Sequence, residues 1–330
     1  GTNSIRLLVS APDGTSLDRR MQITRLGAGV DRTGVLSPEA VERTLEVLRQ
    51  FGEVMDSHGA GSRLASATSA VRDASNSELF IRPATHLLGV EPKVLAGEEE
   101  GRLAYRGATA ELEPGDGPYV LVDVGGGSTE LVTAGGGSTK LVAAGEGSTE
   151  LVTSGSEPPL PQDKGSLGRP VPAPLVAVSL DVGCVRVTER FLDSDPPSAT
   201  EIESASSFAT RLAADAVGHH PELGAPARLV GVAGTVSALS MLSLGLGAYD
   251  RDRVHHSRLE RSTIEGLLKK LAALPLAARR RLRGIEPARA EVLVGGAIVL
   301  GAVMDVLGFE ALVVSESDIL DGMVAELLHG

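Results

Sequence analysis

The residues Asp123-Val124-Gly125-Gly126-Gly127-Ser128-Thr129-Glu130 lie between two apolar runs and carry the most informative pattern in this chain. The flanking runs, 119–124 and 128–132, predict a strand, a tight glycine turn and a second strand. Glycines leave successive backbone N–H groups uncovered, so that these can point at an anion, and two hydroxyl side chains add further donors. The turn therefore indicates a phosphate-binding loop formed by Gly125, Gly126, Gly127, Ser128 and Thr129.

Two acidic residues, Asp123 and Glu130, stand at the ends of this loop and would repel a phosphate directly. Their presence is explained if a divalent cation lies between carboxylate and phosphate, which is how Mg²⁺ is bound in proteins. We therefore expect Asp123 and Glu130 to be ligands of Mg²⁺ or Mn²⁺. No Gly-Lys-Ser/Thr follows, as in a Walker A loop, and a strand rather than a helix comes next, unlike in a dinucleotide fingerprint. An ordinary hairpin turn is the alternative interpretation of the motif alone.

Two other segments repeat parts of this pattern. The amino-terminal residues 1–9 begin Gly-Thr-Asn-Ser and then become apolar, so they align with the loop as Gly-x-x-Ser. Residues 231–235, Gly-Val-Ala-Gly-Thr, follow a strand and open a helix, whose N–H groups favour anions, although a plain strand-to-helix connection is the alternative. Related hairpins about one domain apart predict a duplicated fold with a ligand between its halves. The phosphate-binding residues predicted here are Asn3, Ser4, Gly234 and Thr235.

Strand-like and helix-like segments alternate along the chain. A Ser-Pro-Glu cap at 37–39 starts one helix. The predicted strands are 5–9, 63–68, 92–96, 119–124, 128–132, 175–181, 227–232 and 312–315, and the predicted helices are 37–54, 74–88, 98–110, 198–217, 236–244, 262–283 and 288–307. This order is typical of an α/β layered fold, and the length of 330 residues predicts about two domains. The arginine-rich run at 279–283 is expected on an exposed helical face.

The composition restricts the partners and the location. The formal charge of −12 disfavours nucleic acid and anionic membranes as partners of the whole chain. The longest apolar run, 292–303, is too short for a membrane span. The single cysteine, Cys184, has no partner within the chain, so we expect a cytoplasmic protein. A homodimer is left open.

A ten-residue repeat follows the glycine loop. Residues 125–134 recur as 135–144 and again as 145–154, but only the first copy has acidic residues at both positions described above. We predict that the later copies form an elongated hairpin or flap without a phosphate site. The proline-rich residues 157–174 predict an extended linker, so the whole insertion spans about 134–174.

Six segments, taken together and in order, are far more specific than any one of them. They are Gly1-Thr2-Asn3-Ser4, Thr68-Ser69-Ala70-Val71-Arg72-Asp73, Gly97-Glu98-Glu99-Glu100-Gly101-Arg102, the loop at 123–130, and residues 179–186 and 231–235. This order resembles the exopolyphosphatase and guanosine pentaphosphate phosphohydrolase family over nearly the whole chain except 134–174. The resemblance implies an α/β protein with two ribonuclease H-like domains of the actin-like ATPase superfamily and a cleft between them. It places the domains at 1–118 and 119–330 and implies the short, two-domain form.

The resemblance also implies roles for single residues. Glu100 matches the family's residue that activates the attacking water, and a carboxylate beside a water in line with a terminal phosphoryl group acts as a general base. Arg72 matches an arginine that faces the substrate, and a guanidinium fork suits phosphate oxygens. Without the resemblance, Glu100 is a solvated helix start and Arg72 an ion-pair partner of Asp73. The family's metal and phosphate-loop carboxylates match Asp123 and Glu130.

The activity implied is Mg²⁺-dependent hydrolysis of the terminal phosphate of inorganic polyphosphate. Hydrolysis of guanosine pentaphosphate is the first alternative, because both substrates present a terminal phosphoanhydride. A catalytically weak regulator that binds polyphosphate or a nucleotide is the second. The family has an Asp two residues before the Gly that matches Gly1, at the end of a first strand, and we expect both to be missing from this chain.

Overall fold

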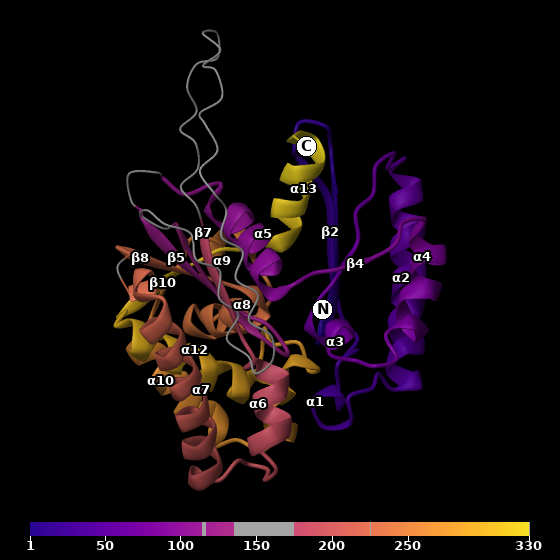
Figure 1. Cartoon of the computed structure of the whole chain (residues 1–330). Helices are drawn as coiled ribbons and strands as arrows, with labels where there is room; N and C mark the ends of the chain where they lie inside the picture. The colour runs from indigo at the N-terminus through magenta and orange to yellow at the C-terminus, as the bar shows by residue number, and fades with distance from the viewer. Residues whose placement is uncertain (114–116, 135–174, 225, 330) are drawn as a thin grey trace, which may run out of the picture.

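The computed structural model describes residues 1–113, 117–134, 175–224 and 226–329, and it confirms the predicted α/β class. Figure 1 shows two units side by side. The first unit contains β1 to β4 and α1 to α4, and the second unit is built around a six-stranded sheet in the order β7-β6-β5-β8-β10-β9. The strands are β1 Ser4–Ser10, β2 Ser16–Ile23, β3 Ser66–Ala67, β4 Lys93–Val94, β5 Tyr119–Val124, β6 Thr129–Ala134, β7 Leu175–Leu180, β8 Arg228–Val232, β9 Arg258–Glu260 and β10 Ala311–Val314. The helices are α1 Val30–Thr33, α2 Pro38–Ser57, α3 Ser69–Arg72, α4 Glu78–Leu88, α5 Gly97–Thr109, α6 Cys184–Phe191, α7 Ala199–His219, η2 Pro221–Gly224, α8 Ala233–Ser243, α9 Arg251–Val254, α10 Arg261–Ala272, α11 Leu276–Arg279, η3 Arg289–Glu291, α12 Leu293–Leu307 and α13 Ile319–His329.

The large sheet brings three strand ends to one edge. Strands β5, β8 and β10 are parallel to one another, whereas β6 runs antiparallel to β5 and joins it directly through the glycine loop. Open α/β sheets bind their ligands at the carboxyl ends of such parallel strands. Here those ends lead to the glycine loop, to the start of α8, and to the segment 315–318.

Helices cover both faces of this sheet. Along β5, Val120, Val122 and Val124 belong to the core that α7 and α12 share, because alternate side chains point to opposite faces. Tyr119 and Leu121 face the other way, into a core formed with α5 and α13. The alternation therefore directs the next side chain on that second face, Asp123, toward α5.

The long apolar run is a core helix. Helix α12 has hydrophobic residues on all sides and packs against α6, α7 and α10. None of the helices in the described ranges is both long and apolar enough to span a bilayer.

The first unit is held by helix packing against a small strand pair. Helix α2 begins as its sequence predicts, with the Ser37 hydroxyl accepting a hydrogen bond from the Ala40 amide at 3.2 Å. It packs against α4, and its buried side chains share a core with Ile5 and Leu7 of β1. Strand β2, which the sequence pattern did not reveal, pairs antiparallel with β1. Most of its residues are polar and exposed, so they lack the alternation that marks a half-buried strand.

The predicted helix over 262–283 is wrong in its second half. Helix α10 ends at Ala272, and Pro275 precedes the separate short helix α11, because proline lacks the N–H that a continuous helix needs. The expectation of an exposed basic face also fails for Arg279, which is only 5% exposed and pairs with Asp195 at 3.3 Å.

Two predictions are not decided by these elements. The later repeat copies and the proline-rich segment lie outside the described residues. The domain boundary at residue 118 stays a prediction, and α5, which precedes it, packs against β6, β7 and α13.

Candidate active site

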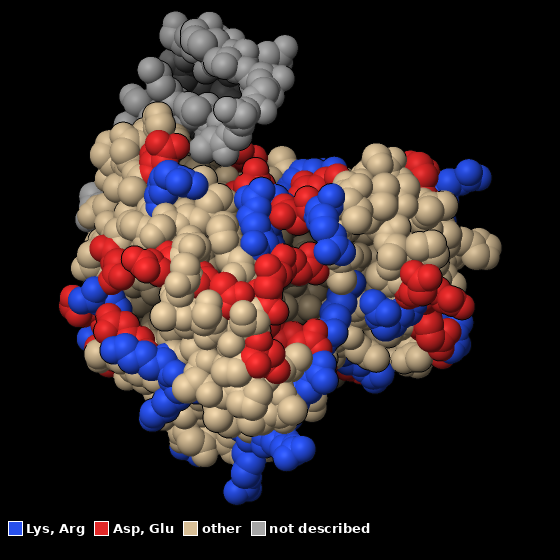
Figure 2. All heavy atoms as spheres, turned by 90° about the horizontal axis from the view of Figure 1, so that it is seen from below, with Lys and Arg blue, Asp and Glu red and all other residues tan. Residues whose placement is uncertain are grey.

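A cleft of about 550 Å³ lies where the two units meet. It is lined by the first residues of the chain, the glycine loop, the first turn of α5, the start of α8 and the segment 315–318. Figure 2 shows acidic and basic side chains next to one another along the join between the units. The predicted cleft thus lies at the carboxyl edge of the parallel strands.

The glycine loop packs directly on two other segments of the site. A Cβ atom on Gly126 would lie 2.6 Å from Cβ of Thr2, and one on Gly127 would lie 2.3 Å from Oγ of Ser69, so only glycine fits at either position. The hydroxyls of Thr2 and Ser69 are themselves 2.9 Å apart. Asn3 follows with its side chain buried and its Oδ1 without a hydrogen-bond partner. The loop, the amino-terminal turn and the start of α3 therefore form one surface.

Three carboxylates converge beneath this surface. Asp123 and Glu130 are paired directly across β5 and β6 and lie on the sheet face that α5 covers. Helix α5 can approach the sheet closely there because residue 101 is a glycine. A Cβ atom on Gly101 would lie only 2.7 Å from Cγ2 of Val132. The close approach brings Glu100 to the same place, with its side chain only 15% exposed. Like charges directly opposite each other destabilise a sheet, so this arrangement indicates a site rather than a stabilising contact.

Burial raises the pKa values of all three carboxylates, and neighbouring acidic groups add to the rise. Burial raises the pKa of Glu100 to about 7, and the Asp123 carboxylate adds to this rise. Burial also raises the pKa of Asp123 to about 6, against the opposing effect of the Arg6 guanidinium. The pKa of Glu130 lies well above its usual range, first through burial and then through the charges of Glu100 and Asp123. Glu100 thus has the pKa that a general base near neutral pH requires.

Most of the predicted site residues meet in the cleft. Those that line it are Asn3, Ser4, Glu100, Asp123, Gly125, Gly126, Ser128, Gly234 and Thr235. Four others do not: Arg72, Gly127, Thr129 and Glu130.

Gly127 packs against Ser69, as described above, and each of the other three has its own environment. Thr129 is fully buried and its hydroxyl donates to the Val182 carbonyl, so the structure does not support a direct phosphate contact by its side chain. Glu130 is 1% exposed and accepts a hydrogen bond from Oγ of Ser179 at 3.0 Å. Arg72 donates to the Leu95 carbonyl at 2.8 Å and lies 4.0 Å from Oε2 of Glu100. Arg72 therefore lies next to the predicted base, where it can orient the carboxylate.

The start of α8 is shaped for close approach. Ala233 has a φ of 72°, in the left-handed region that favours glycine, and such outliers cluster at functional sites. A Cβ on Gly234 would lie 1.7 Å from Nη1 of Arg289, so the guanidinium occupies the space that glycine leaves open. Within the described residues the Arg289 guanidinium forms no ion pair, and its only hydrogen bond is a weak one, from Nη2 to Sδ of Met21 at 3.8 Å. Burial lowers its pKa, as expected of a cation without a partner.

The sequence reasoning missed several charged residues of the cleft, among them Arg6, Arg289 and Asp318. Arg6 and Asp318 form an ion pair that joins β1 to the segment before α13. A signal for Asp318 was present, since Glu316-Ser317-Asp318 follows a predicted strand in the same way as the glycine loop does. Arg289 had no comparable signal, because η3 reaches the cleft only through the packing of the second unit.

The carboxylates fit a divalent cation, although they do not form a complete protein cage. In the described residues no three His, Cys, Asp or Glu side chains are grouped as metal ligands. Oε2 of Glu100 and Oε2 of Glu130 are nevertheless buried without hydrogen-bond partners. Mg²⁺ is commonly held by one or two carboxylates, with waters and substrate phosphates completing the shell. The donor set therefore suits a cation that binds together with a phosphate.

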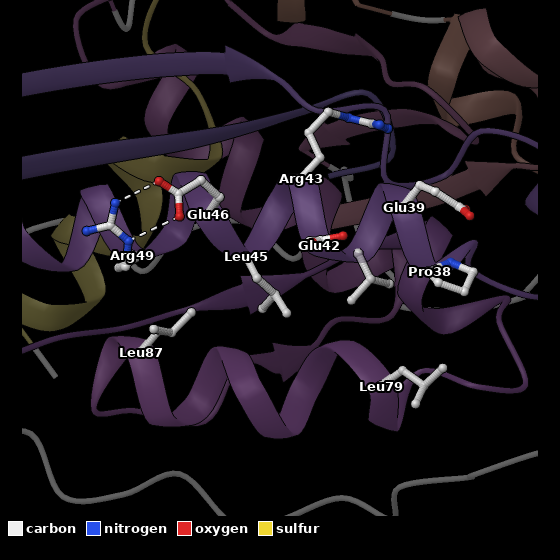
Figure 3. A pocket seen from close by; sticks show the side chains of 10 residues that line it. Pro38, Glu39, Glu42, Arg43, Leu45, Glu46, Arg49, Leu79 and Leu87 are labelled. Carbon is white, nitrogen blue, oxygen red and sulfur yellow. Dashed lines mark hydrogen bonds and ion pairs between the residues drawn. The ribbon is translucent and has the colours of Figure 1, made fainter.

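A second hollow, of about 760 Å³, lies far from these groups, between α2 and α4. Figure 3 shows Leu45, Leu79 and Leu87 along it. Arg49 beside it is paired with Glu46 at 2.6 Å. Its paired charges and aliphatic lining offer nothing that suits a phosphate.

The fold and the cleft define an α/β phosphohydrolase whose site is built from a glycine loop and buried carboxylates. Residues 9–330 match the Ppx/GppA phosphatase family, and the chain belongs to this family, whose members are hydrolases acting on phosphoanhydride bonds.

Relatives agree with this assignment over almost the whole chain. Exopolyphosphatase 2 of Mycobacterium tuberculosis is 36% identical, with 99% of this chain and 96% of that protein covered. A guanosine-5'-triphosphate,3'-diphosphate pyrophosphatase of Vibrio vulnificus is 27% identical, with 99% of this chain but 58% of that protein covered. The crystal structure of an exopolyphosphatase-like protein superposes with a TM-score of 0.80 at 31% identity, covering 99% of this chain and 96% of the other.

Proposed function

We propose that this protein is an exopolyphosphatase that removes the terminal phosphate of inorganic polyphosphate by attack of water. The observation that carries the proposal is the position of Glu100, which is largely buried, lines the cleft beside the glycine loop, and has a pKa raised to about 7. A carboxylate with these properties accepts a proton from water near neutral pH. The full-length similarity to an exopolyphosphatase supports the choice of substrate.

The groups around Glu100 would bind the phosphate and stabilise its charge. The glycine loop and the start of α8 line the cleft, so their backbone N–H groups would be available to phosphate oxygens there. Arg6 and Arg289 bring positive charge to the same cleft. Phosphoryl transfer depends mainly on positioning and on charge stabilisation, and these groups supply both.

Magnesium is part of the proposal, with Mn²⁺ as its substitute. Asp123 and Glu130 would hold the ion, with Glu100 close enough to share its field. The ion would neutralise charge between these carboxylates and the substrate phosphates. Support comes from the unpartnered buried carboxylate oxygens at this place.

Guanosine pentaphosphate is the second candidate substrate. The observation that favours it is the part of the cleft where Met241, Tyr249 and Ile285 provide an apolar and aromatic lining of the kind that accommodates a base.

A cytoplasmic location, consistent with a single buried cysteine, completes the proposal. The homodimer and the weak regulator stay predictions.

The test is phosphate release from long-chain polyphosphate and from guanosine pentaphosphate, each with and without Mg²⁺. We expect turnover of polyphosphate that requires the metal and falls by roughly 10² to 10⁴ in Glu100→Gln. The matched control is Glu99→Gln, because Glu99 lies in the same helical turn but pairs with Lys93 at the surface. Binding of polyphosphate without any phosphate release would instead favour the regulator, and unchanged turnover in Glu100→Gln would refute the role of Glu100.

A further inference from the structure

Arg186, the third residue of α6, connects the glycine loop to two acidic residues of the first unit. Its Nε donates to the carbonyl oxygen of Gly127 at 2.8 Å. Its two terminal nitrogens contact Asp31 at 2.8 Å and Asp73 at 2.7 Å. The planar guanidinium fork can hold these three groups at once, which the single ammonium of a lysine cannot do with the same geometry.

The first turn of α6 completes the support of the loop. The amide of Cys184 donates to the Gly125 carbonyl at 2.9 Å, and the amide of Val185 donates to the Gly126 carbonyl at 2.8 Å. All three glycine carbonyls are therefore turned toward α6. In a trans peptide the carbonyl and the following N–H point in opposite directions. The amides of Gly126, Gly127 and Ser128 are consequently directed away from α6, and Gly126 and Ser128 line the cleft.

Asp73 extends the connection to the predicted base. One of its carboxylate oxygens contacts Arg186, while the other lies 3.7 Å from Nε of Arg72. Arg72 in turn places Nη1 4.0 Å from Oε2 of Glu100. A continuous series of charged groups thus runs from the loop through both units to Glu100.

We propose that Arg186 is a positioning residue for phosphoanhydride hydrolysis, which fixes the phosphate-binding amides of the glycine loop and, through Asp73 and Arg72, the orientation of Glu100. The inference rests on the proposed function for its reaction but on the described contacts for its geometry. Arg186 itself does not line the cleft, so it acts only through these neighbours.

The decisive variant is Arg186→Met, which keeps much of the side chain's length and removes every polar contact. We expect kcat/KM for polyphosphate to fall roughly 10²-fold, because small displacements of a positioned group have costs of that order. The KM should rise, since loop amides lose their alignment, and kcat should fall, since the base loses its support. Arg186→Lys should recover part of the loss, because it restores one charged contact.

The matched control is Arg190→Met, one turn further along α6. Arg190 is 48% exposed and lies 3.8 Å from Asp31, without a contact to the loop. We expect its kcat/KM to stay within twofold of the parent. The double variant Arg186→Met/Asp73→Asn should lose little more activity than Arg186→Met alone, since both changes interrupt the same connection.

A measurement that does not depend on turnover separates this inference from the proposed function. Backbone hydrogen exchange of the segment 125–130 does not require turnover, and it should accelerate in Arg186→Met but not in Arg190→Met at equal Tm. If the parent protein hydrolysed no polyphosphate while exchange changed in this way, the proposed function would fail and the loop support would stand. Unchanged exchange, or a loss of kcat alone that follows a lowered Tm, would overturn the role of Arg186.

Discussion

Replacing Glu100 by Gln should make the protein more stable at alkaline pH while removing its activity. Burial raises the pKa of Glu100 from the usual 4.5 to about 7. The folded state therefore binds more protons than the unfolded chain between these pH values, so the free energy of unfolding falls as the pH rises through this window. Each pKa unit corresponds to about 1.4 kcal/mol, so keeping Glu100 ionised at pH 8 costs about 3 kcal/mol.

Gln has nearly the same shape and stays neutral at every pH, so it removes this cost. At pH 8 and without Mg²⁺ we expect the unfolding free energy of Glu100→Gln to exceed that of the parent by up to about 3 kcal/mol, or roughly 4 °C in Tm for a chain of this length. At pH 5 the parent carboxyl is already protonated in the folded state, so the two proteins should differ little.

The assay is thermal unfolding followed by circular dichroism at both pH values, together with phosphate release. Glu99→Gln is the control, because that side chain is 38% exposed and pairs with Lys93, so its Tm should change equally little at pH 5 and pH 8. A Glu100→Gln protein with the parent's Tm at pH 8 would refute the reasoning that this carboxylate is held ionised against burial.

Three further predictions follow from the same groups. The kcat/KM for polyphosphate should rise with pH through an apparent pKa near 7, because Glu100 must be deprotonated to accept a proton from water; a flat profile between pH 6 and 8 would exclude it as the base. Asp123→Asn should abolish the response of turnover to Mg²⁺ and, by removing a buried acid whose pKa is raised to about 6, should raise the Tm at pH 8; retention of the Mg²⁺ titration would remove Asp123 from the metal site. Gly101→Ala should lower both the Tm and kcat, because the new methyl group would meet Val132 at 2.7 Å and push α5 away from the carboxylates. The control Gly266→Ala lies in α10 with open space around it, so it should leave kcat unchanged and raise the Tm slightly. Equal effects of the two substitutions would contradict the inference that Gly101 is needed for the close approach of α5.

The parts of the site that the sequence revealed are those built from local patterns. The strand at 119–124, the glycine loop after it and the start of α5 near residue 97 are each encoded within a few consecutive residues. Their apolar alternation, glycines and acidic first turn depend on backbone sterics and helix electrostatics, which act over short distances. These features predicted the glycine loop of the cleft, whereas the role of Glu100 was implied only by the resemblance of its segment to the family.

The remaining parts depend on register and on packing between distant segments. That Asp123 faces Glu130 follows from a cross-strand pairing, and that both lie beneath α5 follows from the glycine at 101. Arg279 looked like one member of an exposed basic run until packing placed it against Asp195. Arg289 carries no motif, and it reaches Gly234 only because η3 folds back over the start of α8. Neither composition nor periodicity contains this information.

The charge distribution of the cleft explains why binding and hydrolysis would depend on the same few groups. A site that only binds a polyanion would be expected to contain mainly cationic side chains. This cleft instead places Glu100, Asp123 and Glu130 together in a buried environment. Burial raises the pKa of all three, and the charge of Asp123 raises the pKa values of Glu100 and Glu130 further, so the cluster is unfavourable at neutral pH unless a proton or a cation joins it. A phosphate that arrives with Mg²⁺ would satisfy the acids and the loop amides together, and Glu100 would then be free of the proton that it otherwise retains. The electrostatic cost that destabilises the site above pH 7 would thereby favour the state in which water can be activated.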